Sequence, residues 1–416
     1  AGEPSVFQHV IYIIKENRTY DQVLGDVKAG NGDAAICNFG RRVTPNEHKL
    51  VADFVLLDNT YCSGLVSADG HQWTDTAIAT DYIEREFGAW PRSYPCGGFG
   101  PMSRDALAFS SAGFIWNDVL EHGKSFRDYG EYTSPATHWT GPVPHGGVGW
   151  SAIYHDFLNG TRHTVLACEP DVESLRPYLD TNTVGWDLRV PDIVRAAEFI
   201  RELQQFAQTG KFPNFIMIWL PNDHSSGTEY GAPTPEAQVA DNDLALGRIV
   251  EAISHSCFWT NTCVFAIEDD PQFGWDHVSG FRTTAYVASP FTRRHATVST
   301  QYNQTGVLRT IELMLGLPPL NQMDATATPM FDCFTNTPDF AAYTAVTNQV
   351  PLDEMNPPPA KISNAQLRRD ARASARLPLA KEDQCPEDLF NHILWRATMG
   401  TQRPYPAWAV SASPDD

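Results

Sequence analysis

Several features that mark other protein classes are missing from this chain of 416 residues. No hydrophobic run approaches the length needed to cross a bilayer, so the sequence predicts no transmembrane segment. Basic residues are not in excess, and the formal net charge is −20. A nucleic-acid partner is therefore not expected, because little would displace counterions from phosphates. A small anionic substrate is still compatible with this charge, since a local cation can hold it.

Two nucleotide or esterase motifs are also absent. The chain has no G-x-x-x-x-G-K-[ST] loop for a nucleoside triphosphate, and no G-x-S-x-G elbow surrounds Ser67. The eight cysteines form no CxxC pair and no zinc-finger spacing. Their even number, and a start at Ala1, favour a secreted or periplasmic protein. Cys257 and Cys263 are close enough for a short disulfide bridge, and the alternative is that several cysteines are buried free thiols.

Five short apolar runs have the composition of strands buried on both faces of a sheet. They cover residues 10–14, 54–57, 215–219, 263–267 and 284–288. Helical patterns follow at 190–206, 241–253 and 307–315, the last with Thr305 as N-cap and Gly316 as C-cap. Strands alternating with helices predict an α/β fold with a mainly parallel central sheet covered by helices on both faces.

Two regions depart from this alternation. Residues 88–190 are rich in Gly, Pro, Trp, Tyr and His, and we expect a loop-rich insertion over the active edge of the sheet. Its aromatic residues are compatible with a pocket for an alcohol or choline-like group, or simply with packing of the loops; they include Trp90, Tyr94, Trp116, Trp139 and Trp150. Residues 335–416 are Pro-rich, then basic, and end in a predicted helix over 386–396. We expect one catalytic domain over 1–334 and a C-terminal extension packed on it.

Acidic and amide side chains follow three of the predicted strands. They are Glu16-Asn17, Asn222-Asp223-His224, and Glu268-Asp269-Asp270 with Asp276-His277 further on. Open α/β sheets bind ligands at the carboxyl ends of their strands, although such residues often only cap turns. Three consecutive carboxylates repel one another unless a cation or protons neutralise them. The pattern therefore predicts a metal site gathered from distant parts of the chain.

A candidate nucleophile lies in SGLVSADGHQWTD (63–75), which follows the second predicted strand. Ser67 sits between Gly64 and Gly70 on a turn ahead of a helical stretch, where a bound dication could activate its hydroxyl. The alternative is that Ser67 and Thr74 only cap the helix that begins near His71. The two roles are compatible, because a helix N-terminus also offers amides to an anion.

Four motifs in order resemble a known family: ENRTYD (16–21), DNTYCS (58–63) with the Ser67 turn, PNDH (221–224) and EDDPQFGWDH (268–277). They are similar to those of the bacterial phosphoesterase family, which contains non-specific phospholipases C and acid phosphatases of the alkaline phosphatase superfamily. The resemblance extends from about residue 10 to 334 and implies an alkaline-phosphatase-like fold. It also implies Glu16, Asn17, Asp269 and Asp270 as metal ligands, Ser67 as nucleophile, and His224 as a contact of the phosphoryl group.

The chain departs from that family around the nucleophile. The phospholipases carry a Gly-Pro-Thr-x-Pro-Asn-Arg type of turn that is absent here, so Thr60, Ser63 and Thr74 remain alternatives to Ser67. An obvious C-terminal lipid-recognition module is also lacking, which favours phosphoester hydrolysis in general over phospholipase action. A sulfatase or phosphonate hydrolase is disfavoured, because no Cys-x-Pro-x-Arg motif for formylglycine occurs.

The expected reaction is phosphoryl transfer through a covalent phosphoserine, on a small phosphate ester or a phospholipid head group. His224 or His277 would contact the phosphoryl oxygens or protonate the leaving group, His71 would add a contact, and Arg18 is a candidate counter-ion. The oxygen ligands favour calcium, magnesium or manganese, and the histidines keep zinc or iron open. Asp223, His224 and His277 could hold a second ion. The alternative function is a secreted, metal-stabilised binding protein with an inert Ser67.

Overall fold

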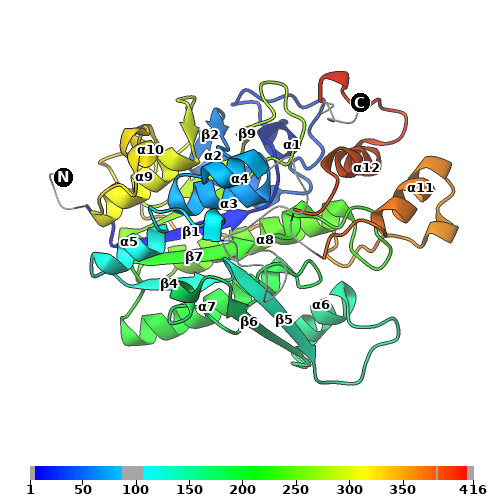
Figure 1. Ribbon diagram of the computed structural model, residues 1–416, viewed down its shortest axis with the longest axis horizontal. Helices are drawn as coiled ribbons and strands as arrows, with labels where there is room; N and C mark the ends of the chain where they lie inside the picture. The colour runs from blue at the N-terminus through cyan, green and yellow to red at the C-terminus, as the bar shows by residue number, and fades with distance from the viewer. Residues whose placement is uncertain (1–4, 87–105, 381–382, 410–416) are drawn as a thin grey trace.

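A five-stranded sheet with the order β10–β8–β1–β7–β4 forms the centre of the computed structural model, which describes residues 5–86, 106–380 and 383–409 (Figure 1). The strands are β1 (His9–Lys15), β4 (Phe126–Tyr129), β7 (Phe215–Leu220), β8 (Thr262–Glu268) and β10 (Ala285–Ala288). Neighbours among β4, β7, β1 and β8 run parallel, and β10 is antiparallel to β8. The predicted α/β class with a mainly parallel sheet is confirmed.

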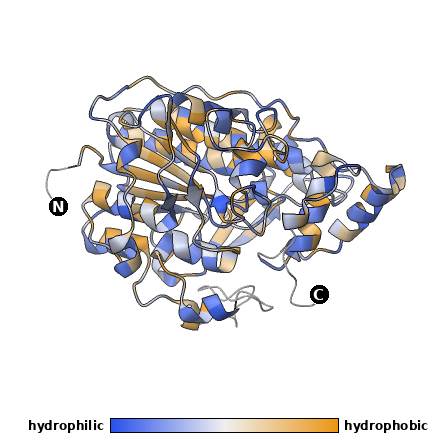
Figure 2. Cartoon of the chain, turned by 90° about the horizontal axis from the view of Figure 1, so that it is seen from above, coloured by the Kyte–Doolittle hydropathy of each residue, from blue (hydrophilic) through white to orange (hydrophobic). Residues whose placement is uncertain are grey.

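Alternate side chains of β1 enter two different cores, because successive residues of a strand point to opposite faces. Ile11 and Ile13 pack with helices α2 (Pro45–Asp53), α7 (Asp192–Thr209) and α8 (Pro235–Ser254). Val10, Tyr12 and Ile14 pack with α3 (Ser67–Thr76), α5 (Ile115–Glu121) and α9 (Gln304–Leu315). Helices therefore cover both faces, and Figure 2 shows the apolar colour concentrated on the strands between them.

Helix boundaries differ from the predicted ones where a cap was misplaced. The helix predicted from 241 begins at Pro235, behind the N-cap Thr234, whose side chain accepts a hydrogen bond from Ala237 N. The N-cap of α9 is Asn303 and not Thr305, since the Asn303 side chain accepts from Gly306 N at 3.0 Å. Gly316 ends α9 in the left-handed conformation, as predicted.

The predicted strand at 54–57 lies outside the five-stranded sheet. It forms β2 (Val55–Leu57), which pairs with β11 (Ala296–Val298) in a two-stranded sheet and contacts β10. A second small sheet has three strands from distant parts of the chain: β3 (Thr60–Tyr61), β9 (Arg282–Thr283) and β12 (Tyr302–Asn303). The described residues also form three short helices, α1 (Tyr20–Leu24), α4 (Asp81–Glu86) and α10 (Gln322–Thr326).

The stretch expected to be loop-rich also contains regular structure. Besides α5 and β4, it holds an antiparallel pair, β5 (Thr133–Trp139) with β6 (Thr164–Pro170), and α6 (Trp150–Asn159) between them. The Gly- and Pro-rich residues 141–149 connect β5 to α6. Trp90 and Tyr94 lie outside the described residues.

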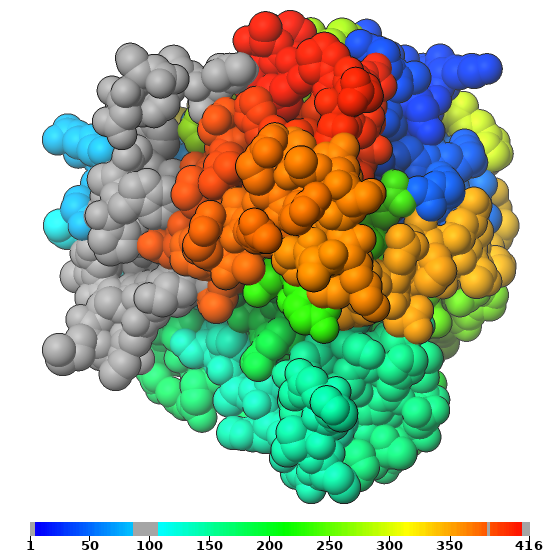
Figure 3. Space-filling model, turned by 90° about the vertical axis from the view of Figure 1, so that its right-hand side faces the viewer, coloured from blue at the N-terminus to red at the C-terminus, as the bar shows by residue number. Residues whose placement is uncertain are grey.

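The C-terminal extension contacts the body of the molecule through α12 (Glu387–Met399), while α11 (Ala365–Ser374) precedes it. Trp395 of α12 meets Trp275 with ring centroids 5.1 Å apart. Figure 3 shows these orange and red segments spread over one face of the molecule. None of the described helices has both the length and the apolar composition needed to cross a membrane.

The predicted bridge between Cys257 and Cys263 is wrong. Both thiols are free, as is every cysteine among the described residues. Cys263 is fully buried within β8, whereas Cys257 is exposed, so the side chains lie in different environments. Cys96 falls outside the described residues.

Candidate metal centre and nucleophile

The in-register pairing of β1 with β8 brings two acidic segments together. Lys15 stands opposite Glu268 at the carboxyl ends of these parallel strands, and Asp269 N donates to Lys15 O at 3.0 Å. The next residues, Glu16 and Asn17 on one strand and Asp269 and Asp270 on the other, therefore meet. This is the edge at which open α/β sheets bind ligands.

Asn17 links the two segments from an unusual backbone conformation. Its φ is 62°, in the left-handed region that asparagine tolerates better than most residues. Its side-chain amide donates to Asp270 Oδ2 at 2.7 Å and its backbone N lies 3.4 Å from Asp269 Oδ1. The side-chain oxygen Oδ1 is buried and has no hydrogen-bond partner among the described residues.

Ser67 is the first residue of α3 and points into this cluster. Its Oγ donates to Asp270 Oδ2 at 2.9 Å and lies 3.3 Å from Glu16 Oε2. The helix comes this close because position 70 is glycine: a Cβ there would stand 2.7 Å from Asp269 O. Of the four hydroxyls considered, Ser67 is the one that hydrogen-bonds to the carboxylates in the described structure; the Thr74 hydroxyl donates to His71 O instead.

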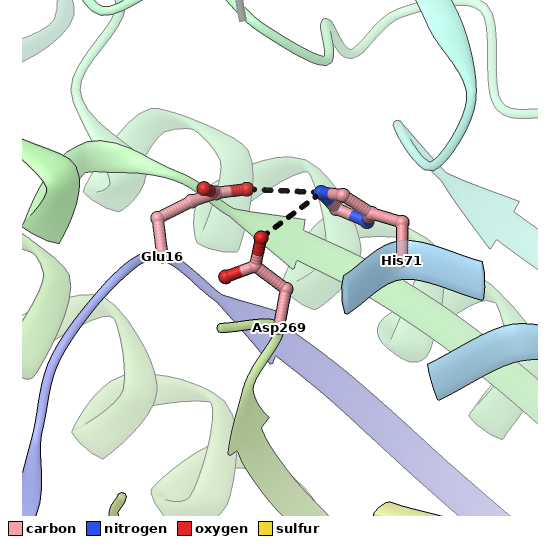
Figure 4. Close-up of side chains that lie close together, drawn as sticks. All are labelled: Glu16, His71 and Asp269. Atoms are coloured by element: carbon pink, nitrogen blue, oxygen red, sulfur yellow. Dashed lines mark hydrogen bonds and ion pairs between the residues drawn. The ribbon is translucent and has the colours of Figure 1, made fainter. Parts of the chain in front are cut away.

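His71 lies one turn along α3 and joins the same cluster (Figure 4). Its Nε2 is 3.1 Å from Glu16 Oε1 and 3.5 Å from Asp269 Oδ2. A ligating atom from each of these three residues lies within 4.8 Å of the others. The sequence suggested a phosphoryl contact for His71, and this position equally allows it to be a metal ligand.

Burial dominates the electrostatics of the cluster, since Glu16, Asp269 and Asp270 have no exposed surface. Loss of water raises the pKa of Glu16 to about 7 and that of Asp270 to about 6. Burial and the adjacent Asp270 raise the pKa of Asp269 well above its usual range. Burial opposes the charge on His71, but Glu131 and its other acidic neighbours hold its pKa well above the ordinary value. His71 and Arg18 are thus cationic neighbours of these carboxylates, and the interaction of Arg18 with Asp270 and Glu16 agrees with the counter-ion role predicted for it.

The donor set fits a divalent cation. Among the described residues, Asn17 Oδ1 has no hydrogen-bond partner, and the buried Asp269 Oδ2 has none beyond its ion pair with His71 at 3.5 Å, so both oxygens could accept a cation. Carboxylate and amide oxygens suit magnesium, calcium or manganese, and one imidazole nitrogen also suits zinc. Neutralising the repulsion between these carboxylates would lower their raised pKa values.

Asp223 lies close to the cluster but faces a different cation. Its Oδ1 accepts from Glu16 N at 3.0 Å, while its Oδ2 is 3.1 Å from Lys15 Nζ. The same buried ammonium group lies 2.6 Å from Glu47 Oε1 and 2.8 Å from Glu268 Oε1. Lys15 therefore compensates Asp223 and Glu268, and a role of Asp223 in metal binding stays a prediction.

His224 and His277 do not hydrogen-bond to Ser67 or to the carboxylate cluster in the described structure. His224 Nδ1 is 2.9 Å from Ser225 O, its ring stacks on Phe390, and burial lowers its pKa to about 3. A neutral ring that donates through Nδ1 has only an acceptor at Nε2. His277 is exposed, with Nδ1 2.6 Å from Asp21 Oδ2. Their catalytic roles stay predictions.

Arg18 serves the scaffold of the site. Its buried guanidinium donates to Asn17 O at 2.9 Å and to His224 O at 2.7 Å, so it ties the segment after β1 to the segment after β7. Trp219 and Glu131 were not predicted to take part. Trp219 Nε1 donates to Glu16 Oε1 at 2.8 Å, and Glu131 Oε1 lies 2.8 Å from His71 Nδ1.

The aromatic residues that could line a pocket lie in different environments. Trp150 lines a cavity of about 620 Å³, together with Trp186, Glu229 and Tyr230. Trp186 also meets His224 edge to face, with ring centroids 5.0 Å apart. Trp116 is buried and stacked on Phe114 at 4.2 Å, so it packs the core instead of lining a pocket.

No protein-family model and no curated protein matches the chain. Solved structures with a similar arrangement include an alkaline phosphatase superfamily protein from Vibrio parahaemolyticus, at 16% identity over 77% of this chain and 70% of that one, with a TM-score of 0.46. The phosphonate monoester hydrolase of Agrobacterium radiobacter is 12% identical over 80% and 78%, with a TM-score of 0.44. The lipoteichoic acid synthase LtaP from Listeria monocytogenes is 10% identical over 94% and 91%, also at 0.44. Since all three TM-scores lie below 0.5, the residues of the site carry the functional proposal.

Proposed function

We propose that the protein is a metal-dependent hydrolase of phosphate esters that forms a covalent phosphoserine at Ser67. The observation that carries this proposal is the position of one hydroxyl among buried carboxylates. Ser67 Oγ lies 2.9 Å from Asp270 Oδ2 and 3.3 Å from Glu16 Oε2, at the N-terminus of α3. Such a hydroxyl has both an acceptor for its proton and a candidate cation site beside it.

The candidate metal ligands are Glu16, Asn17, Asp269 and Asp270, with His71 Nε2 as a fifth donor. A divalent cation bound there would lower the pKa of the Ser67 hydroxyl and offset the charge of the phosphoryl oxygens. The four oxygen ligands agree with those implied by the phospholipase C and acid phosphatase motifs, and this agreement supports phosphoester chemistry.

The chain's own residues support the first half of the reaction. Asp270 accepts the hydrogen bond of the Ser67 hydroxyl and is the nearest acceptor for its proton. The N-terminus of α3 favours negative charge on the attacking oxygen. The bond from Ser67 Oγ to phosphorus forms as the bond to the alcohol oxygen breaks. The proton that leaves Ser67 goes to Asp270 and is passed on to the departing alkoxide. Water then cleaves the phosphoserine, which releases inorganic phosphate from a monoester or a phosphate monoester from a diester.

The substrate class proposed is a small phosphate ester, with a phospholipid head group as the finer alternative. Hydrolysis of p-nitrophenyl phosphate, bis-p-nitrophenyl phosphate and p-nitrophenyl sulfate tests this class, each with and without a chelator. We expect chelator-sensitive turnover of the phosphate esters and little of the sulfate. Turnover of the sulfate ester alone would contradict the proposal.

The nucleophile is tested with Ser67→Ala, which should lose at least about 1,000-fold in kcat because the attacking oxygen is gone. Ser63→Ala is the matched control on the same turn, and it should keep most of the activity. Acid quenching followed by mass spectrometry should find phosphate on Ser67. His71→Ala should also lose activity, whereas His277→Ala should cost far less, since His277 is exposed and paired with Asp21.

A protein that melts at lower temperature with chelator but turns over no ester would favour the alternative, a metal-stabilised binding protein. Loss of activity in Ser63→Ala with full activity in Ser67→Ala would reassign the nucleophile.

A further inference from the structure

The ring of His71 is held from several sides within the protein. Its Nδ1 lies 2.8 Å from Glu131 Oε1, while its Nε2 faces Glu16 and Asp269. Trp219 meets the ring edge to face at 5.1 Å, and Tyr132 lies 6.0 Å away between ring centroids. His71 is only 3% exposed, so solvent does little to reorient it.

The contact with Glu131 decides which nitrogen of His71 carries hydrogen. Glu131 Oε1 lies 2.8 Å from Nδ1, so a hydrogen on Nδ1 has an acceptor at hydrogen-bond distance. When a metal ion takes the place of the hydrogen on Nε2, the nitrogen that faces Glu16 and Asp269, the hydrogen on Nδ1 stays with Glu131 and the Nε2 lone pair is free to ligate. The opposite tautomer would direct an N–H group toward the candidate cation site and could not ligate.

The loop between β4 and β5 holds Glu131 rigidly. Gly130 and Tyr132 on either side have φ values of 106° and 46°. A non-glycine residue in this region is strained, and it persists only where the surroundings enforce it. Here the Tyr132 ring packs against Phe114 at 5.6 Å, and Glu131 N donates to Asp128 Oδ1 at 3.3 Å.

A second carboxyl group stands behind this contact. Asp75 lies one turn beyond His71 on α3, where its side chain is buried and hydrogen-bonds to Glu131. Ligating atoms of His71, Asp75 and Glu131 lie within 4.8 Å of one another. Glu131 therefore contacts the ring at Nδ1, while Nε2 faces Glu16 and Asp269.

We propose that Glu131 is a positioning residue, which fixes the Nδ1–H form of His71 and so presents Nε2 to a metal ion held with Glu16 and Asp269. This proposal rests on the metal site of the proposed function. Partners of this kind orient a ligating imidazole and increase its basicity, and their loss typically weakens metal binding by about 10- to 100-fold.

The experiment measures Mn²⁺ binding to the full chain after a chelator has stripped it, by the electron paramagnetic resonance signal of free Mn²⁺. Glu131→Gln keeps the shape and removes the charge, and the expected dissociation constant rises by about 10- to 100-fold. The matched control is Glu169→Gln, an exposed and ion-paired glutamate on β6 in the same part of the chain. Its dissociation constant should match that of the wild type.

A second background shows whether Glu131 acts through the imidazole. In His71→Ala, adding Glu131→Gln should change Mn²⁺ affinity by no more than about twofold, because the positioned ring is gone. An equal loss in both backgrounds, or an unchanged affinity in Glu131→Gln alone, would overturn the proposal. Two ions per chain, one of them lost in Asp75→Asn, would make Glu131 a ligand itself and also overturn it.

A measurement on the wild-type protein does not depend on whether a variant folds. With Zn²⁺ bound, ¹⁵N resonances of His71 should show a protonated Nδ1 and a metal-bound Nε2 without hydrogen, and the reverse pattern would contradict the proposal. Metal binding without ester turnover would count against the proposed function alone. Turnover with unaltered affinity in Glu131→Gln would count against the positioning role alone.

Discussion

Glu312 on α9 is a buried acid whose charge the fold disfavours. Its side chain has no exposed surface, and Asp324 of α10 lies beside it. Burial and the neighbouring carboxylate raise the pKa of Glu312 to about 9, although Arg309 Nη1, 2.9 Å from its Oε2, opposes the shift. The folded protein therefore binds a proton here at neutral pH.

This proton makes stability depend on pH in a known direction. The unfolded glutamate has a pKa of about 4.3, so its contribution is full below that value and is lost as pH rises toward about 9. The side chain of Glu312→Gln is neutral at every pH. Between pH 5 and 9 we expect the free energy of unfolding of the wild type to fall more than that of Glu312→Gln, and the difference should be on the order of 2 kcal/mol. Urea unfolding at several pH values measures this. Parallel profiles for the wild type and Glu312→Gln, with the exposed Glu121→Gln as control, would contradict the assignment.

The residues of the candidate metal centre differ in how far the sequence could predict them. Glu16, Asn17, Asp269 and Asp270 directly follow apolar strands, so their convergence follows from parallel pairing alone. Glu131 reaches His71 across 60 residues of chain, from a segment whose composition indicated loops. No local pattern marks such a partner, because the contact depends on how β4 joins the sheet.

At the scale of elements, one buried ammonium group joins three segments. Lys15 ends β1, and its Nζ lies 2.6 Å from Glu47 on α2, 2.8 Å from Glu268 on β8 and 3.1 Å from Asp223 after β7. All four side chains are at most 1% exposed. Removing one partner from such a group leaves uncompensated charges in a medium that solvates them poorly.

We therefore expect Lys15→Met to lower the free energy of unfolding by about 3–5 kcal/mol, since three carboxylates would lose their cation. Lys49→Met is the control, because Lys49 is partly exposed and pairs only with Asp53 along α2. It should cost less than about 1 kcal/mol. Denaturant unfolding of chelator-treated protein compares the two, and equal losses would show that the Lys15 group is not the link between these segments.

Elements themselves were predicted where the chain carries a local signal. The four predicted strands of the central sheet are continuous apolar runs. Such a run, as in β1, predicts a strand from the local sequence alone, without knowledge of the neighbouring strand. The pairing of β2 with β11 was not predictable, because the composition of a strand does not show which other strand it pairs with. The start of α8 was predictable from Thr234 and Pro235, a capping residue followed by proline in the first turn.

At the scale of the whole molecule, the C-terminal extension contacts the two segments that follow β7 and β8 at the carboxyl edge of the sheet. Phe390 of α12 stacks on His224, with ring centroids 5.2 Å apart. Asn391 donates to Gln272 O at 3.0 Å, two residues after Asp270. The extension therefore braces the segments after β7 and β8, on the face shown in Figure 3.

Phe390→Ala tests this brace. Phe390 is 1% exposed, and deleting a buried phenyl ring costs about 3–5 kcal/mol through lost burial and the cavity left behind. Leu389→Ala is the matched control on the same helix, since Leu389 is 41% exposed and should cost about 0.5 kcal/mol or less. Thermal and urea unfolding measure both. If α12 braces the site, Phe390→Ala should also weaken Mn²⁺ binding, because the segment carrying Asp270 loses support. A stability loss with unchanged affinity would confine α12 to the scaffold.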